Sequence, residues 1–101
     1  MSTEDLIQHS RARLAHANQR KLLREKYEAK MLIAHQGGMF RAGPELLNLV
    51  ALYPGQHIVI QDLYQNPVRV DCDQLREQAG QRWQEQMNAW LNELDNMSQE
   101  R

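Results

Sequence analysis

The sequence predicts an α+β fold in a single small domain, residues 1–101, in the order long helix, short strand, short helix, β-hairpin and long amphipathic helix. Three observations lead to this prediction. The stretch from Thr3 to Gln36 contains neither proline nor glycine, which favours one long helix. Isoleucine and valine alternate with other residues between 57 and 70, as in strands, and apolar residues recur every three or four positions after Leu75, as in a helix.

The first predicted helix begins near Thr3. The hydroxyl of Ser2 or Thr3 can cap it, and the two acidic residues that follow complement the helix dipole. We expect this helix to continue to about Gln36, a length of roughly 50 Å at 1.5 Å per residue. A compact chain of about 100 residues has a radius of gyration near 13 Å, so residues 1–20 are expected to project or to be only partly ordered. Gly37 is expected to close the helix in a left-handed conformation.

The middle of the chain, residues 38–70, is expected to form the core. The sequence Met-Phe-Arg-Ala after the glycine pair predicts a short strand, and a leucine-rich helix is expected over 45–53 because proline and glycine delimit it. Strands over 57–61 and 67–70 then form a hairpin, which the first strand can extend to three strands. We expect this middle region to pack against both long helices.

The last helix is expected over residues 72–98. Asp71 or Asp73 is placed to cap it, and Gln74 stands three positions after Asp71, as in a capping box. Its apolar stripe consists of Leu75, Ala79, Trp83, Met87, Trp90, Leu91, Leu94 and Met97. These three- and four-residue steps predict an amphipathic helix.

Part of this stripe, formed by Trp83, Met87, Trp90 and Leu94, is the candidate partner interface. Large aromatic and aliphatic side chains at helical spacing are typical of a helix that binds another helix. A core or a coiled-coil seam is the more usual interpretation of this spacing. The stripe can also pack against the first helix, which would give an antiparallel pair within one chain.

The charges of the chain are unevenly distributed. The net charge is −1, but residues 9–30 carry seven basic and two acidic side chains, whereas residues 71–101 carry three basic and seven acidic ones. The basic residues Arg11, Arg13, Arg20, Lys21 and Arg24 are therefore candidate contacts for a nucleic acid or for an acidic partner. A sequence pI near 6.4 and the lack of interleaved aromatic residues favour a solvated face or an acidic partner over a nucleic acid.

No pattern of catalytic, metal-binding or cofactor-binding residues stands out, so we expect neither enzyme activity nor a cofactor or metal site. Cys72 is expected to be a structural cysteine, because the flanking Asp71 and Asp73 raise the pKa of its thiol. A single cysteine is typical of a reducing compartment, and the sequence has no apolar run long enough to span a membrane and no signal peptide. We therefore expect a cytoplasmic protein.

The stretches "LREKYEAKMLIAHQGGMFRAGPELL" and "DLYQNPVRVDCDQLREQAGQRWQEQMNAW" resemble small, poorly characterised proteins of contractile-tailed bacteriophages. The resemblance covers about residues 22–90. It depends on the Gly-Gly-aromatic turn after a helix, the Asn-Pro turn and the tryptophan-rich last helix. It implies a role in virion assembly or an accessory role, in the host cytoplasm or in the virion, and it assigns no functional residue.

Together these observations predict a non-catalytic structural or assembly protein that associates through its long helices, with another protein or with a second copy of itself. The alternative is a nucleic-acid-binding accessory protein that uses the basic part of the first helix. Salt distinguishes the two, because phosphate contacts weaken steeply with salt while apolar helix packing does not.

Overall fold

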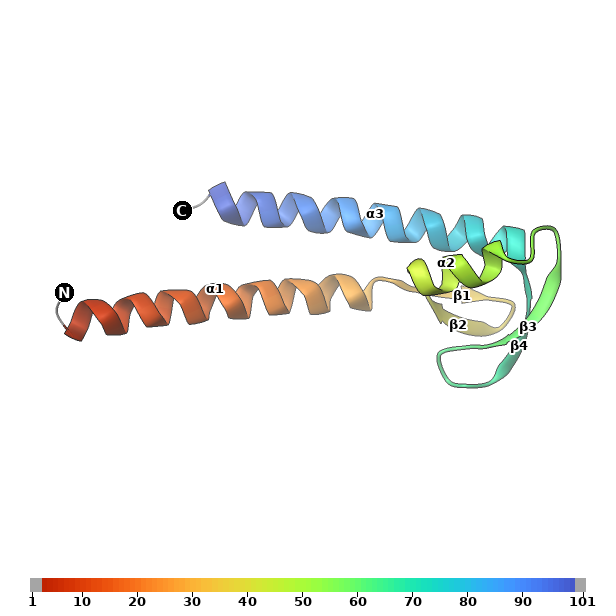
Figure 1. Cartoon of the computed structure of the whole chain (residues 1–101), viewed down its shortest axis with the longest axis horizontal. Helices are drawn as coiled ribbons and strands as arrows, with labels where there is room; N and C mark the ends of the chain where they lie inside the picture. Colours follow the sequence, from red (N-terminus) through yellow and green to blue (C-terminus); the bar gives the residue numbers. More distant parts are fainter. Residues whose placement is uncertain (1–2, 100–101) are drawn as a thin grey trace.

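The structure is a computed structural model that describes residues 3–99. Two long helices, α1 (Thr3–Ala29) and α3 (Cys72–Gln99), run antiparallel beside each other, and the shorter elements gather at one end (Figure 1). We call α1 together with α3 from Trp83 onward the arm, and residues 30–82 the head. The molecule measures 65 × 26 × 20 Å and its radius of gyration is 19.3 Å. The α+β class is confirmed, and the arm makes the molecule much longer than a compact globule.

The first helix is shorter than predicted. It ends at Ala29, and the chain continues as strand β1 (Leu32–His35), which pairs antiparallel with β2 (Gly38–Arg41). The predicted continuation to Gln36 is therefore wrong. The physical reason is tertiary: pairing with β2 buries the side chains of Ile33 and His35, which a helical continuation would not do.

Gly37 is left-handed, but it does not cap a helix as predicted. Gln36 and Gly37 have φ values of 51° and 80° and form the two-residue connection between β1 and β2. Positive φ at both central residues is the mark of a type I′ turn, which matches the twist of the two strands that it joins. The strand expected over Met-Phe-Arg-Ala is confirmed with a shift of one residue.

The predicted helix and hairpin of the middle region are present. Helix α2 (Pro44–Ala51) ends two residues earlier than expected, and β3 (His57–Gln61) pairs antiparallel with β4 (Pro67–Asp71). The expected three-stranded sheet is wrong, because β2 pairs with β1 and the two hairpins form separate sheets. The second hairpin reaches β2 through the loop after β3, where the Leu63 N–H donates to the Met39 carbonyl at 2.7 Å.

Asp62 organises this loop and connects it to β2. Its carboxylate accepts hydrogen bonds from the backbone N–H groups of Met39, Tyr64 and Asn66. Burial of Asp62 by itself would raise the pKa of this carboxyl group. The hydrogen bonds from the backbone outweigh that effect and hold the pKa below its ordinary value.

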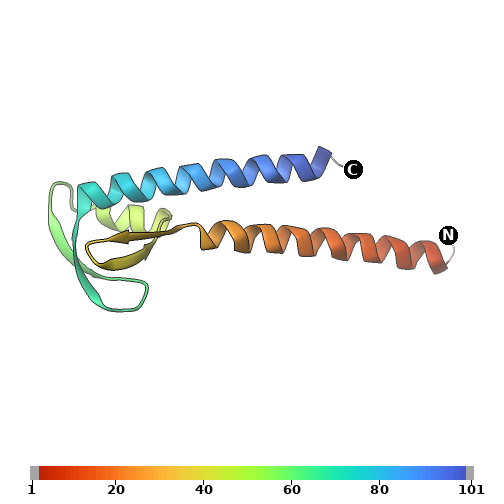
Figure 2. The same cartoon turned by 180° about the vertical axis from the view of Figure 1, so that it is seen from behind.

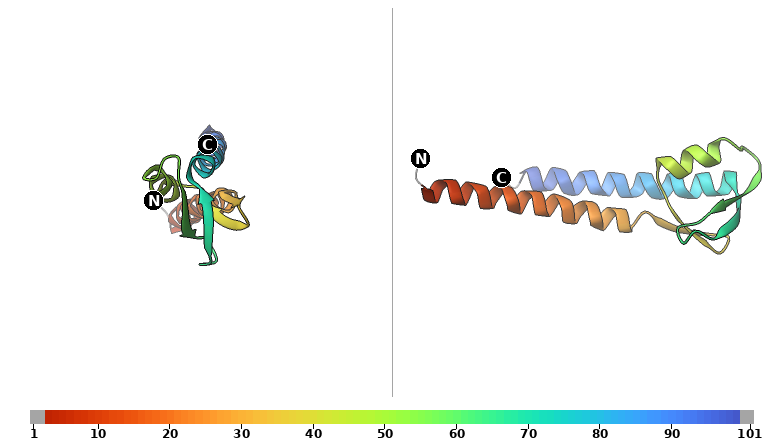
Figure 3. Two further views of the ribbon diagram at one scale, coloured as in Figure 1. Left: turned by 90° about the vertical axis from the view of Figure 1, so that its right-hand side faces the viewer. Right: turned by 60° about the horizontal axis from the view of Figure 1, so that its bottom comes forward.

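Helix α3 begins as predicted, because the Asp71 Oδ1 atom accepts a hydrogen bond from the Gln74 N–H at 3.1 Å. The core of the head lies against the first part of α3. It consists of Ile33, Phe40, Ala42, Val50, Val70, Cys72, Leu75 and Ala79. Helix α2 packs on α3 where Gly80 lies close to Leu47. Figure 3 shows α2 and the strands gathered around this end of α3.

The expectation that the middle region packs against both long helices is wrong. Apart from the pairing within each hairpin, the elements between the two long helices make their main contacts with α3, and the main contacts of α1 are also with α3. The reason is the early end of α1: the chain leaves the helix before it reaches the head, and β1 continues into the head in its place (Figure 2).

Candidate protein-interaction site

The last turns of α1 are fastened to α3 by an aromatic stack and a shared carboxylate. Tyr27 stacks on Trp90 with ring centroids 6.0 Å apart. The ammonium group of Lys26 lies 2.6 Å from Glu93 Oε1, and the Tyr27 hydroxyl donates a hydrogen bond to the same oxygen. One face of the Trp90 ring is therefore covered by a residue of its own chain.

This cluster shifts the pKa of each of its ionisable groups. Hydrogen bonds from Lys26 and then from Tyr27 hold the pKa of Glu93 below its ordinary value. The hydrogen bond to Glu93 raises the pKa of both Lys26 and Tyr27. The charged carboxylate with a charged Lys26 and a neutral Tyr27 is thus the favoured state around neutral pH.

An open apolar groove runs along the flank of α3, beside the Tyr27 contact. It has a volume of about 340 Å³ and is lined by Trp83, Gln84, Met87, Asn88, Trp90, Leu91 and Leu94. Leu91 is 56% exposed, whereas Trp83, Met87, Trp90 and Leu94 are half-buried. The four residues predicted as a partner interface therefore do lie along one surface, and Leu91 completes it.

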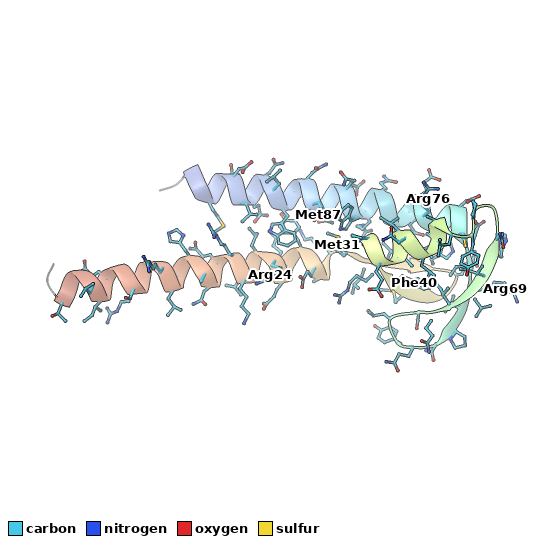
Figure 4. All side chains as sticks on the ribbon, viewed as in Figure 1. Arg24, Met31, Phe40, Arg69, Arg76 and Met87 are labelled. Carbon is cyan, nitrogen blue, oxygen red and sulfur yellow. The ribbon has the colours of Figure 1, made fainter. Side chains whose placement is uncertain are left out.

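A second hollow of about 500 Å³ continues this groove between the two helices of the arm. It shares Trp90, Leu91 and Leu94 with the first, and it adds Asp95 and Met97 from α3 and His16, Arg20 and Arg24 from α1. We call the two hollows together the arm groove. Its floor is the apolar stripe of α3 and one of its rims is basic. Figure 4 labels Met87 on α3 and Arg24 on α1 along this stretch.

The N-terminal turns of α1 carry a second apolar surface, which we call the tip patch. Leu6, Ile7 and Leu14 are all exposed, and together with Thr3, Ser10 and Arg11 they line a shallow hollow of about 310 Å³. The Lys26–Glu93 contact sets the antiparallel register of the arm, so the last described residue of α3 lies at about the level of Arg20. The tip patch lies beyond that level and nothing in α3 covers it (Figure 1).

The five basic residues singled out in the sequence are all exposed, but they do not form one site. Arg20 and Arg24 border the arm groove, while Arg11 lines the tip patch. In the described part of the chain, the Lys and Arg residues form a single ion pair with a carboxylate, and that pair is Lys26 with Glu93.

Cys72 and His35 are both buried in the head. The Cys72 side chain is fully buried, and burial, followed by the charges of Asp73 and Asp71, raises the pKa of its thiol. The buried imidazole of His35 accepts a hydrogen bond from the Asp71 N–H at Nε2 and lies 3.3 Å from Gln78 Oε1 at Nδ1. Among residues 3–99, no three His, Cys, Asp or Glu side chains are placed to hold a metal ion together.

Comparisons of the chain with protein-family models, with curated proteins and with solved structures give no match. Over the described range, neither long helix has an apolar stretch that would cross a bilayer. What defines the protein structurally is a small α+β head that carries an antiparallel helical arm with an open apolar groove.

Two features of the arm were not anticipated from the sequence. One is the Lys26–Tyr27–Glu93 contact, and the other is the tip patch. A signal for the second was present, since Leu6, Ile7 and Leu14 are large apolar residues in a helix whose neighbouring residues are polar. Their exposure followed from the antiparallel register, which no local pattern shows.

Proposed function

We propose that the chain is a non-catalytic assembly or interaction protein that binds a protein helix in the arm groove. The observation that carries this proposal is the continuous apolar floor of the groove, from Trp83 to Leu94, on helices that project from the head. Contiguous exposed apolar surface on a small protein is typical of an interaction site. A groove between and beside helices is a common place for an amphipathic helix to bind.

The chemistry of the groove suits a protein helix better than a small molecule. The groove is long and open along one side, so it would leave most of a small molecule exposed to water, whereas binding sites for small molecules usually enclose their ligand. Its aromatic and methionine side chains can adjust to an apolar partner surface, and its basic rim favours a partner that carries acidic residues. No cofactor is part of this proposal.

The resemblance to proteins of contractile-tailed phages would make this binding part of virion assembly or of an accessory process. A single buried cysteine fits a cytoplasmic setting, or the virion if the chain is phage-encoded.

Photo-crosslinking tests the proposal. A photoreactive phenylalanine analogue at Leu91, in the groove, should form covalent adducts with protein in the cells that naturally make the chain. The same analogue at Leu22 is the matched control, because Leu22 is equally surface-exposed on α1 but lines neither the groove nor the tip patch. Adducts at both positions in equal amounts, or at neither, would contradict the proposal.

The alternative function, nucleic-acid binding, is favoured by one observation: Arg13, Arg20 and Arg24 are exposed and follow one another along one side of α1. Replacing Arg20 and Arg24 by glutamate should then abolish binding to a labelled DNA duplex or RNA, and added salt should weaken the wild-type binding steeply. If a labelled duplex and a labelled RNA both fail to bind the wild-type chain at low salt, this alternative is excluded.

A further inference from the structure

We propose that the arm groove is occupied by the tip patch of a second copy of the chain. Two arms then lie side by side in opposite directions, each tip in the groove of the other, and form a four-helix bundle with the heads at its two ends. The inference depends on the proposed function and names the partner of the same groove.

The two surfaces lie on the same side of the arm. Ser10 and Thr3 precede Arg24 by two and three heptads, so in paired helices they point in the same direction as Arg24. Arg24 borders the arm groove, and Ser10 and Thr3 line the tip patch. A two-fold symmetric contact requires that one face of the molecule carry both of its complementary surfaces, and this face does.

The two surfaces also match in length. From Leu6 to Leu14 the tip patch extends about 12 Å along the helix axis, and from Trp83 to Leu94 the groove floor extends about 16 Å, at 1.5 Å per residue. The groove can therefore accept the whole tip patch. Leu6, Ile7 and Leu14 supply aliphatic side chains of the size that fits between aromatic and methionine side chains.

The charges favour the antiparallel arrangement of two copies. Residues 9–20 of one copy, which carry Arg11, Arg13 and Arg20, then lie level with residues 88–99 of the other, which carry Glu93 and Asp95. The two-fold axis falls near Arg20, midway between the tip patch and the level of Leu91, because the Lys26–Glu93 contact fixes the register of each arm. This places Asp95 of one copy level with His16 of the second copy, within one to two turns of its Arg11 and Arg20.

Disulfide trapping between two variants tests this arrangement. Leu14→Cys and Leu91→Cys are suitable because both side chains are exposed in the single chain, at 64% and 56%. Cys72 does not compete, since it is fully buried. One variant carries a tag that changes its mass. When the two are mixed under mild oxidation, we expect a mixed disulfide between them. Leu22→Cys mixed with Leu91→Cys is the control. It should give at least about tenfold less mixed disulfide, because Leu22 lies about 200° around the helix from Arg24 and so points away from the groove.

The mass in solution provides the second measurement. Wild-type protein should have twice the mass of the chain by light scattering at low and high salt. Leu14→Glu should return it to a single chain without changing its circular dichroism, because a charge in the apolar contact is costly. Leu22→Glu should leave the dimer intact.

Each other outcome overturns the inference. A monomer at high micromolar concentration excludes a second copy as the occupant, and a dimer that does not trap Leu14→Cys against Leu91→Cys associates through a different face. The failure of the proposed function looks different, because the photoreactive residue at Leu91 would then form no more adducts than the one at Leu22. If the photoreactive residue at Leu91 forms adducts with another protein and not with a second copy, the groove is a binding site and only the identity of its occupant is wrong.

Discussion

The ring of Tyr27 lies parallel to the ring of Trp90, with an angle of 6° between the planes and 6.0 Å between the centroids. This stack joins the last turns of α1 to the middle of α3. It covers one face of the indole and leaves the neighbouring Leu91 open to solvent. The same contact therefore stabilises the arm and sets the boundary of its groove.

Trp90→Ala should destabilise the chain by about 1–2 kcal/mol, less than the 3–5 kcal/mol typical of a fully buried aromatic residue, because Trp90 is half-buried. Urea unfolding followed by circular dichroism, at a concentration where the chain is monomeric, measures the change. Leu91→Ala is the matched control, since its exposed side chain should change the free energy of unfolding by no more than about 0.5 kcal/mol. Equal effects of the two substitutions would contradict the role of the stack.

The arm should loosen at acid pH through Glu93. The pKa of this carboxyl group is lower in the folded chain than its ordinary value of 4.5, because Lys26 and then Tyr27 donate hydrogen bonds to it. A lowered pKa contributes stability that is complete above the unfolded value and is lost as the pH falls through the folded one. The free energy of unfolding should therefore decrease below about pH 4.5. The decrease should be smaller in Glu93→Gln, and identical curves for both proteins would contradict the prediction.

Gly37→Val should destabilise the head by about 1–3 kcal/mol, because a β-branched residue does not readily adopt the φ of 80° that this turn requires. The effect is one of backbone conformation alone, since a side chain at this position would meet no atom within 4 Å. Gly37→Asn is the control and should cost clearly less, because asparagine tolerates the left-handed region. Thermal unfolding of the two variants gives the comparison. Equal losses of stability in the two variants would point to a cause other than the backbone conformation.

His35→Leu should cost about 1–3 kcal/mol, although it replaces a polar residue in the core with an apolar one. The substitution leaves the N–H of Asp71 without its acceptor, at the point where β4 passes into α3. Hydrogen exchange should show faster exchange of the Asp71 amide in particular. A stable variant with an unchanged Asp71 amide would mean that the hydrogen bond to His35 contributes little.

The elements with strong local signals could be predicted from the sequence. The β3–β4 hairpin was predicted to within one residue, because alternating isoleucine and valine residues and an Asn-Pro turn determine it locally. The start of α3 was predicted from the Asp71 cap, and its length from a regular apolar stripe. The end of α1 was not predicted. The helical spacing of Tyr27, Met31 and Ala34 continues into β1, and only pairing with β2 shows that the chain there is a strand.

The candidate interface was likewise predictable from the sequence only in part. The spacing of Trp83, Met87, Trp90 and Leu94 showed that they share one side of a helix, but not which edge of it is covered. The structure places Tyr27 against Trp90 and leaves the flank next to Leu91 open. The basic residues of α1 were expected to act together, whereas the structure divides them between the groove rim, the tip and the rest of the surface.

The sequence by itself determined the α+β class, the hairpin, the capped last helix and the opposite charges of the two ends. Caps, turns and alternation depend on neighbours within a few residues, so the order of residues is sufficient to specify them. Only the tertiary structure decided where α1 ends, that α1 and α3 form an arm, and which apolar residues of the arm stay exposed. These features depend on contacts between segments that are 60 or more residues apart in the sequence, such as the contact between Lys26 and Glu93. A side chain is buried only when both segments come together, so neither segment alone determines which residues are exposed.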